Sequence, residues 1–153
     1  MHWLWLAFKD LSVEQLYALL QLRQDVFILE QQCLYADLDN LDQHCMHLLA
    51  VDEHLSTTKL AAYLRIIPAE HHASGYTTLG RILTSADYRG QGLGKHLMQE
   101  TMAYLNTQHR GETIHMSAQS YLEKFYASFG FKTVSEPYDD DGILHIDMQI
   151  NIS

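Results

Sequence analysis

The stretch Arg89-Gly90-Gln91-Gly92-Leu93-Gly94 lies between two segments with different hydrophobic periodicity. A strand-like run from Thr77 to Thr84 precedes it, and a helix-like run from Leu93 to about Leu105 follows it. Alternate glycines at such a junction let backbone N–H groups approach an anion closely, and the helix N-terminus adds the positive end of its dipole. The stretch therefore predicts a loop that binds a diphosphate.

Two other phosphate-binding loops are excluded by spacing. A Walker loop requires a Gly five residues before Gly94 and a Ser or Thr after Lys95, where this chain has Arg89 and His96. A dinucleotide fingerprint requires G-x-G-x-x-G in the first strand-helix unit, with an acidic residue about 20 positions later. Here the spacing is G-x-G-x-G, late in the chain, without that carboxylate. What remains is R-x-x-G-x-G, for which a flexible turn before an ordinary helix is the simpler alternative.

Length and composition indicate one globular domain. The chain has 153 residues, of which 47% are hydrophobic and 19% charged, so we expect a single domain spanning residues 1–153. No apolar run is long enough to cross a bilayer, and the opening residues 1–5 lack the basic start of a signal peptide, which predicts a cytoplasmic protein. The two cysteines, Cys33 and Cys45, are too few for a disulfide framework and are expected to stay reduced.

The net charge of −9 limits the classes of partner. Nucleic acids and anionic membranes require a concentrated basic surface, so we expect neither as a partner. An anionic ligand would have to be held locally, by loop amides together with Arg89 and Lys95. The same overall charge favours a cationic second substrate.

Periodicity around the glycine loop predicts strands alternating with helices. Ser12 and Gln15 have the spacing of a capping box, and Gly130 stands where a helix C-terminus favours a left-handed residue. A polar hairpin connection is expected at 52–58. The order β-α-(α)-β-β-β-α-β-α-β-β indicates an α+β fold. Strands are expected at 3–8, 45–51, 59–67, 77–84, 112–118, 131–134 and 143–150, and helical patterns at 16–27, 93–105 and 122–129.

The segment 30–42 breaks the helical pattern and is expected to be a loop or a short second helix. It contains Asp37, Asp39 and Asp42, but it lacks the Gly and Glu spacing of a calcium-binding EF-hand. The three aspartates are interpreted either as a solvated acidic rim or as a surface that attracts an ammonium substrate. His44 and Cys45 would point to opposite faces of a strand, so they cannot chelate one ion. No metal is expected.

The element order and the loop resemble the GNAT N-acetyltransferases. More narrowly, the run Glu30-Gln31-Gln32-Cys33 and the segment around His145 resemble the ElaA-like branch, and the likeness spans nearly the whole chain. The resemblance implies an α/β/α-layered domain whose mixed, mostly antiparallel sheet contains a splayed central strand pair. It also implies an N-acetyltransferase that transfers an acetyl group from acetyl-coenzyme A directly to an amine of a small molecule or peptide.

The resemblance assigns coenzyme contacts to particular positions. The family holds the pantetheine arm with strand backbone, here at Ile82, Leu83 and Thr84, and a main-chain N–H near Leu83 or Thr84 would polarise the thioester carbonyl. Gln119 stands where the family has a coenzyme-contacting Asn, which keeps the amide chemistry with a longer reach. The loop residues implied for the diphosphate are Arg89, Gly90, Gln91, Gly92, Leu93, Gly94 and Lys95.

Tyr126, seven residues after Gln119 and ahead of Gly130-Phe131, matches the family's catalytic tyrosine. A phenol, with an ordinary pKa of about 10, stays protonated at neutral pH and can donate to the departing thiolate. Simple packing of an aromatic side chain on a helix face is the alternative for this residue.

The sequence leaves the general base open. Many relatives place a Glu on the strand before the loop, but 79–84 offers only Arg81 as a charged residue. Glu30, His115 and His145 are the candidates, and His145 suits the task best because the ordinary pKa of a histidine is about 6.5. Packing of a polar strand residue is the alternative for His145. Glu30, Tyr35 and His145 are the expected contacts of the acceptor.

Two functions other than acetyl transfer are compatible with the same residues. A non-catalytic acyl-coenzyme A sensor would explain the missing strand carboxylate. A binding module could use the acidic segment 37–42 for a basic partner. Exposed strand edges allow a homodimer, and the sequence does not identify the acceptor.

Overall fold

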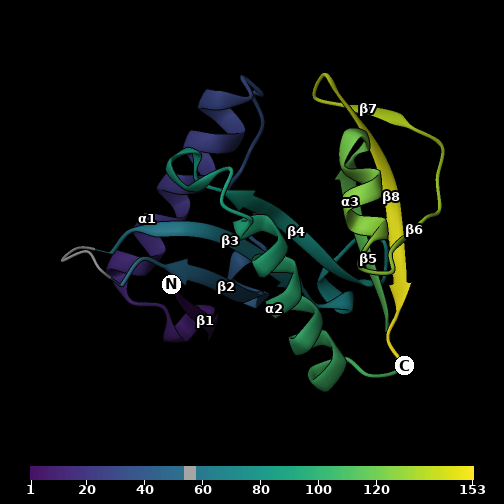
Figure 1. Cartoon of the computed structure of the whole chain (residues 1–153), viewed down its shortest axis with the longest axis horizontal. Coiled ribbons are helices and arrows are strands. Elements are labelled where there is room, and N and C mark those ends of the chain that lie inside the picture. The colour runs from purple at the N-terminus through teal and green to yellow at the C-terminus, as the bar shows by residue number, and fades with distance from the viewer. Residues whose placement is uncertain (54–57) are drawn as a thin grey trace.

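In a computed structural model that describes residues 1–53 and 58–153, eight strands form one mixed sheet with helices on both faces (Figure 1). The strand order is β1-β2-β3-β4-β5-β8-β6, and β7 pairs with β8. Within the connection expected at 52–58, residues 54–57 lie outside the described residues. The strands are β1 (His2–Ala7), β2 (Met46–Val51), β3 (Leu60–Ile67), β4 (Thr77–Thr84), β5 (Thr113–Gln119), β6 (Lys132–Thr133), β7 (Tyr138–Asp140) and β8 (Ile143–Asn151).

The helices follow the expected order, with one difference of type. The capping box of α1 is confirmed, since Ser12 Oγ accepts from the Gln15 N–H at 3.0 Å and Gln15 Oε1 accepts from the Ser12 N–H at 2.9 Å. The helical pattern then continues to Glu30 as a π-helix, and residues 31–41 form no helix or strand, which agrees with the loop expected after the pattern. The helices are α1 (Val13–Arg23), the π-helix η2 (Gln24–Glu30), α2 (Leu93–Gln108) and α3 (Glu123–Ala127), with 3-10 turns at Phe8–Asp10, Asp42–His44, Ala69–His71, Ala86–Tyr88 and Ser120–Leu122.

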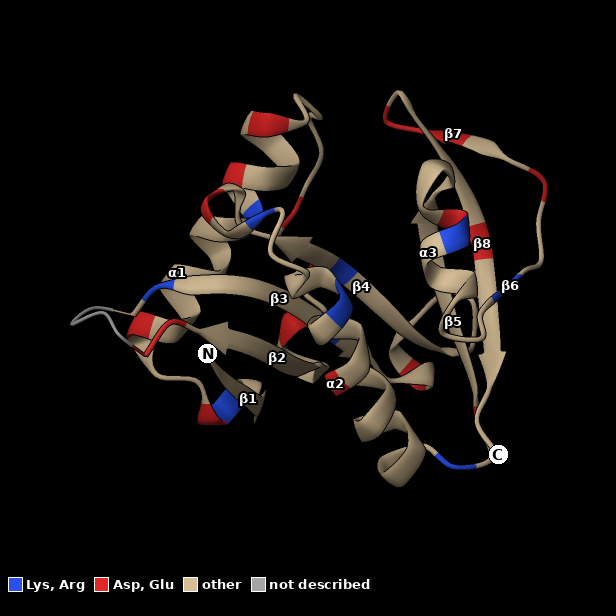
Figure 2. Ribbon diagram, viewed as in Figure 1, with Lys and Arg blue, Asp and Glu red and all other residues tan. Residues whose placement is uncertain are grey.

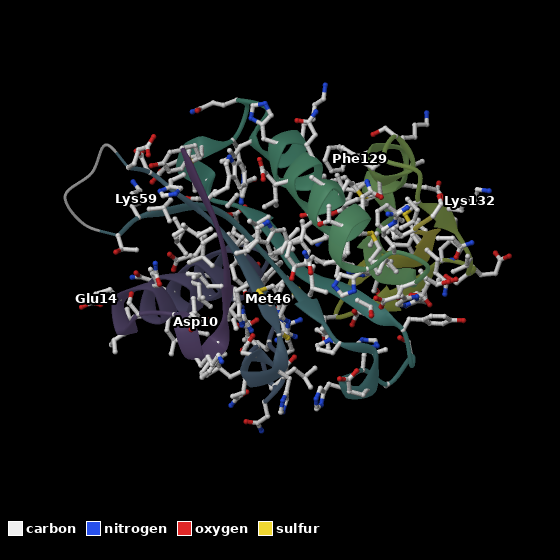
Figure 3. The ribbon with its side chains drawn as sticks, turned by 90° about the horizontal axis from the view of Figure 1, so that it is seen from below. Asp10, Glu14, Met46, Lys59, Phe129 and Lys132 are labelled. Carbon is white, nitrogen blue, oxygen red and sulfur yellow. The ribbon has the colours of Figure 1, made fainter. Side chains whose placement is uncertain are left out.

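Two apolar clusters hold the layers together. Leu19 and Leu22 of α1 pack with Tyr63 of β3 on one face of the sheet. Leu97 and Met98 of α2 belong to the cluster on the other face, together with strand residues of β2 to β5 and β8. Figure 3 shows the purple α1 and the green α2 on opposite sides of the sheet. The α/β/α layering is therefore confirmed, and no helix among the described residues is long and apolar enough to span a membrane.

The central strands β4 and β5 are parallel neighbours only at their first residues. Their register pairs are Thr77 with Ile114, Thr78 with His115 and Leu79 with Met116. Beyond these pairs β4 continues along β3, as far as Thr84 opposite Ala62, while β5 continues along β8. Figure 1 shows the two strands diverging, with α3 beside β5. The splayed central pair is confirmed.

Candidate functional site

A cavity of about 770 Å³ opens where β4 and β5 diverge. This volume lies in the range of about 300–1,000 Å³ that is typical of small-molecule sites. The structure brings both groups of expected residues to its wall. The coenzyme candidates on the wall are Ile82, Leu83, Thr84, Arg89, Gly94, Gln119 and Tyr126, and the acceptor or base candidates are Glu30, Tyr35, His115 and His145.

The glycine loop is shaped for close approach by a ligand. Gly90 and Gly92 have φ of 78° and 72°, a conformation that costs a side chain strain, and no atom lies within 4 Å of a Cβ built at either residue. Gly92 is the N-cap of α2, a helix of 16 residues, whose first N–H groups have no intrahelical acceptor. Leu93 buries its side chain in the core, so only its main chain is available to a ligand.

Not every loop candidate lies on the cavity wall. Gly90, Gln91, Gly92, Leu93 and Lys95 are outside the lining, and Gln91 and Lys95 are exposed. They extend the site along the surface beyond the cavity. A long ligand whose anionic part lies on the loop and whose reactive end enters the cavity fits this arrangement.

Arg89 forms an ion pair with Glu30 and donates to the Thr84 carbonyl at 3.2 Å. The pair joins the end of η2 to the glycine loop across 59 residues of sequence. Both side chains are about two-fifths exposed, 42% for Arg89 and 41% for Glu30, so solvent and ions reach them. Glu30 therefore lies beside the cationic group expected to bind phosphate, with its carboxylate already engaged.

Tyr126 lies in α3 with only 5% of its surface exposed. Its ring packs edge-on against Phe125 and Phe131, at centroid distances of 5.2 and 6.5 Å. Burial, with a smaller contribution from Tyr121, raises the pKa of Tyr126, so the phenol stays protonated at neutral pH. No described residue forms a hydrogen bond with its hydroxyl group. A buried, protonated and unpartnered phenol on a cavity wall can act as a proton donor.

The two histidine candidates differ in the partners of their ring nitrogens. His115 Nδ1 lies 3.3 Å from Gln149 Nε2, and its Nε2 lies 3.9 Å from a carboxylate oxygen of Asp147. His145 Nδ1 lies 2.7 Å from the Ile143 carbonyl oxygen and donates to it, so the neutral form of the ring has its lone pair on Nε2. Among the described residues, nothing hydrogen-bonds to that Nε2. His145 is therefore the better placed of the two to accept a proton.

The interpretation of the acidic segment as a solvated rim is wrong. Its aspartates form a network of ion pairs with three arginines, and two of these, Arg23 and Arg65, are 0% and 1% exposed. Burial alone would raise the pKa of Asp39, but hydrogen bonds and the charge of Arg65 lower it to about 2. The pairs are Arg23 with Asp37 (3.1 Å) and Asp42 (2.7 Å), Arg65 with Asp39 (2.5 Å) and Asp42 (2.8 Å), and Arg81 with Asp37 (2.8 Å) and Asp39 (3.5 Å).

This network also fixes Tyr35, one of the expected acceptor contacts. The guanidinium of Arg81 lies over the Tyr35 ring, 5.3 Å from its centroid, and the Tyr35 hydroxyl donates to Asp37 at 3.4 Å. Burial outweighs the opposing charge of Arg81 and raises the pKa of Tyr35 to about 12. Tyr35 thus presents a neutral, immobilised aromatic ring to the cavity.

The sequence analysis missed the strand β7 and the acidic turn that follows it. Figure 2 shows acidic residues along β7 and the chain just before it. Asp140 and Asp141 of this hairpin are exposed and line the cavity, and the Cys33 thiol lies 3.4 Å from the Asp141 carbonyl. The Asp-Gly pair at 141–142 is a turn signal that could have revealed the hairpin. Its position at the cavity depends on tertiary packing.

Comparison with known proteins agrees with this geometry. The domain family described as "Acetyltransferase (GNAT) domain" matches residues 9–152 of the chain. Protein ElaA of Escherichia coli K12 is 38% identical over 149 residues, which cover 95% of this chain and 94% of ElaA. The crystal structure of E. coli ElaA superposes with a TM-score of 0.87 at 37% identity, covering 97% of each chain. An acyl-CoA N-acyltransferase from Pseudomonas aeruginosa superposes with a TM-score of 0.88 at 36% identity, covering 97% of this chain and 99% of that one.

Proposed function

Because the chain belongs to the GNAT acetyltransferase family, we propose that it transfers an acetyl group from acetyl-coenzyme A directly to an amine of a small molecule or peptide. The observation that carries the proposal is the cavity between β4 and β5, which is lined by coenzyme candidates and by acceptor candidates. Two substrates that meet in one cavity can react without a covalent enzyme intermediate. Their mutual orientation then supplies much of the rate.

The glycine loop binds the diphosphate of the coenzyme in this proposal. Main-chain N–H groups of the loop and of the first turn of α2 donate to phosphate oxygens, and Arg89 and Lys95 supply positive charge. The backbone of Ile82, Leu83 and Thr84, which has no partner on β5, pairs with the amides of the pantetheine arm. Gln119 offers a further amide from the opposite strand.

The reaction forms a C–N bond and breaks the C–S bond of the thioester. A β4 main-chain N–H near Leu83 or Thr84 donates to the carbonyl oxygen, where negative charge develops during the attack. The cationic amine first loses a proton, so that its neutral nitrogen attacks. His145 accepts a proton from that nitrogen through Nε2, Tyr126 donates its phenolic proton to the departing thiolate, and proton exchange with solvent returns both side chains to their starting states. Burial keeps the Tyr126 phenol protonated at neutral pH, which a proton donor requires. Glu30 is the weaker candidate for the base because Arg89 already engages its carboxylate.

The acceptor in this proposal is a cationic amine. The proposed location of the protein is the cytoplasm. Asp140 and Asp141 place negative charge on the cavity wall, in a chain whose net charge is −9. Tyr35 offers a neutral ring face and Glu30 a carboxylate to the same substrate. Electrostatic attraction of this kind raises the association rate of a cation.

A screen for free thiol tests the proposal. Purified protein is incubated with acetyl-coenzyme A and separate polyamines, aminoglycosides, amino acids or short peptides, and thiol release is measured against protein-free controls. We expect release with at least one cationic amine, and mass spectrometry should find one added acetyl group on it. Binding of the coenzyme without thiol release for any amine would contradict the enzyme and favour the acyl-coenzyme A sensor.

A further inference from the structure

The strand β4 contains a bulge at Arg81. Tyr63 of β3 lies opposite Leu83, but Arg65, two residues on, lies opposite Gly80, so Arg81 and Ile82 have no register partner on β3 among the described residues. Arg81 has a φ of 53°, in the left-handed region that is disfavoured for every residue except glycine. Such a conformation persists only where the surroundings hold it in place.

The side chain of Arg81 is held by one loop. Its Nε donates to Asp37 Oδ1 at 2.8 Å, and its Nη2 donates to the Asp37 carbonyl oxygen at 3.1 Å. The face of the guanidinium rests on the Tyr35 ring, 5.3 Å from the centroid. A planar donor fixed at two edges and one face leaves the Arg81 backbone little freedom to return to an ordinary strand conformation.

Asp37 is in turn anchored to the rest of the protein. Its Oδ2 accepts from Arg23 Nε at 3.1 Å, and its carbonyl oxygen accepts from Arg23 Nη2 at 2.9 Å. Arg23 is the last residue of α1 and is fully buried. Asp37 therefore connects a rigid helix end to the bulge, although it does not itself line the cavity between β4 and β5.

We propose that Asp37 is a positioning residue for acyl transfer, which through Arg81 holds the β4 bulge so that the main-chain amides of Ile82 to Thr84 face the thioester. This inference rests on the proposed function, because the amides matter only if a carbonyl is polarised there. The bulge precedes the stretch Ile82 to Thr84 that lines the cavity, so relaxing it moves those amides. A displacement of about 1 Å in such a site can cost about 100-fold in rate.

The Asp37→Asn variant tests the role, with Asp42→Asn as the matched control. Asp42 belongs to the same network but bonds to Arg23 and Arg65, not to Arg81. We expect Asp37→Asn to lower kcat by about 10- to 100-fold while the Kd for acetyl-coenzyme A changes by less than about twofold. Asp42→Asn should lose stability but keep kcat near the wild-type value at temperatures where it is folded. Equal losses of kcat in both variants would overturn the proposal.

Substitutions of Arg81 itself separate backbone conformation from charge. Glycine adopts the left-handed region without strain, whereas alanine does not, so Arg81→Gly should retain a higher kcat than Arg81→Ala. Adding Asp37→Asn to Arg81→Gly should cause no further loss, since the residue through which Asp37 acts is gone. A kcat for Arg81→Gly no higher than that of Arg81→Ala would contradict the positioning role.

Hydrogen exchange separates failure of this inference from failure of the proposed function. Amides of Arg81 to Leu83 should exchange faster in Asp37→Asn than in Asp42→Asn, whether or not an acceptor has been found. Unchanged exchange there would overturn the positioning role even in an active enzyme. A wild-type protein that releases no thiol with any amine would instead refute the proposed function. The role of the bulge in acyl transfer would then be refuted as well.

Discussion

The substitution Tyr126→Phe isolates the proton donor of the proposed reaction. It removes only the hydroxyl group, which has no hydrogen-bond partner among the described residues, and keeps the ring contacts with Phe125 and Phe131. The free energy of unfolding should therefore change by less than about 1 kcal/mol. General acid catalysis typically contributes about 10²- to 10⁴-fold, so kcat should fall by that factor, equivalent to about 3–5 kcal/mol in the activation barrier.

The assay is thiol release at saturating acetyl-coenzyme A and amine, with calorimetric titration of the coenzyme and urea unfolding of each variant. Tyr104→Phe is the control, because Tyr104 lies on α2, stacked on Trp5, outside the cavity wall. Because the pKa of Tyr126 is raised above the ordinary value of about 10, the phenol stays protonated at every pH up to about 10. Wild-type kcat should therefore show no decrease from ionisation of Tyr126 in that pH range. Equal kcat in Tyr126→Phe and wild type would remove Tyr126 from the mechanism.

Three further perturbations test the coenzyme loop and the ion-pair network. Glu30→Gln should bind acetyl-coenzyme A about two- to fivefold more tightly by calorimetry, because the Glu30 carboxylate no longer competes with the diphosphate for Arg89. Asp25→Asn, on the same π-helix, should leave the affinity unchanged. Identical affinities of Glu30→Gln and wild type would contradict this. Gly92 and Gly111 have φ of 72° and 83°, and no atom lies within 4 Å of a Cβ built at either residue. Gly92→Ala and Gly111→Ala should therefore each lose about 1–2 kcal/mol of stability through backbone strain, but only Gly92→Ala should weaken coenzyme binding. The folded-state pKa of Asp39, about 2 against 3.8 ordinarily, predicts about 2 kcal/mol of stability that is present above pH 4 and lost as the pH falls toward 2. Urea unfolding between pH 2 and 7 should show this loss in the wild type and not in Asp39→Asn, and parallel curves would refute it.

Features of the fold set by neighbouring residues were predictable from the sequence. The capping box needs only Ser12 and Gln15, and the strand-like run of β4 spans eight consecutive residues, so both were located correctly. The glycine loop and Gly130, whose φ is 102°, were predictable because residues with a side chain rarely adopt a positive φ. These features were predictable because the interactions that decide them span a few residues.

The ion-pair network depends on contacts that no local pattern reveals. Asp37 and Arg81 are 44 residues apart, and Asp39 and Arg65 are 26 apart, so the aspartates looked like a solvated run. The left-handed conformation of Arg81 could likewise not be predicted from the sequence, since an arginine in a strand pattern does not indicate a bulge. The wider turn of η2 was missed because an apolar pattern of helical spacing does not distinguish an α-helix from a π-helix. The resemblance to relatives singled out Tyr126 as the candidate proton donor, and only the structure showed its burial.

The central claim is that the glycine loop holds the coenzyme so that its thioester enters the opening between β4 and β5. Calorimetric titration of the wild-type protein and of Arg89→Glu with acetyl-coenzyme A tests this claim most directly, because it needs no knowledge of the acceptor. The account predicts saturable binding to the wild type and its loss in Arg89→Glu, with unfolding curves showing that both proteins are folded. Absence of heat with the wild type at millimolar coenzyme, or unchanged binding in Arg89→Glu, would contradict it.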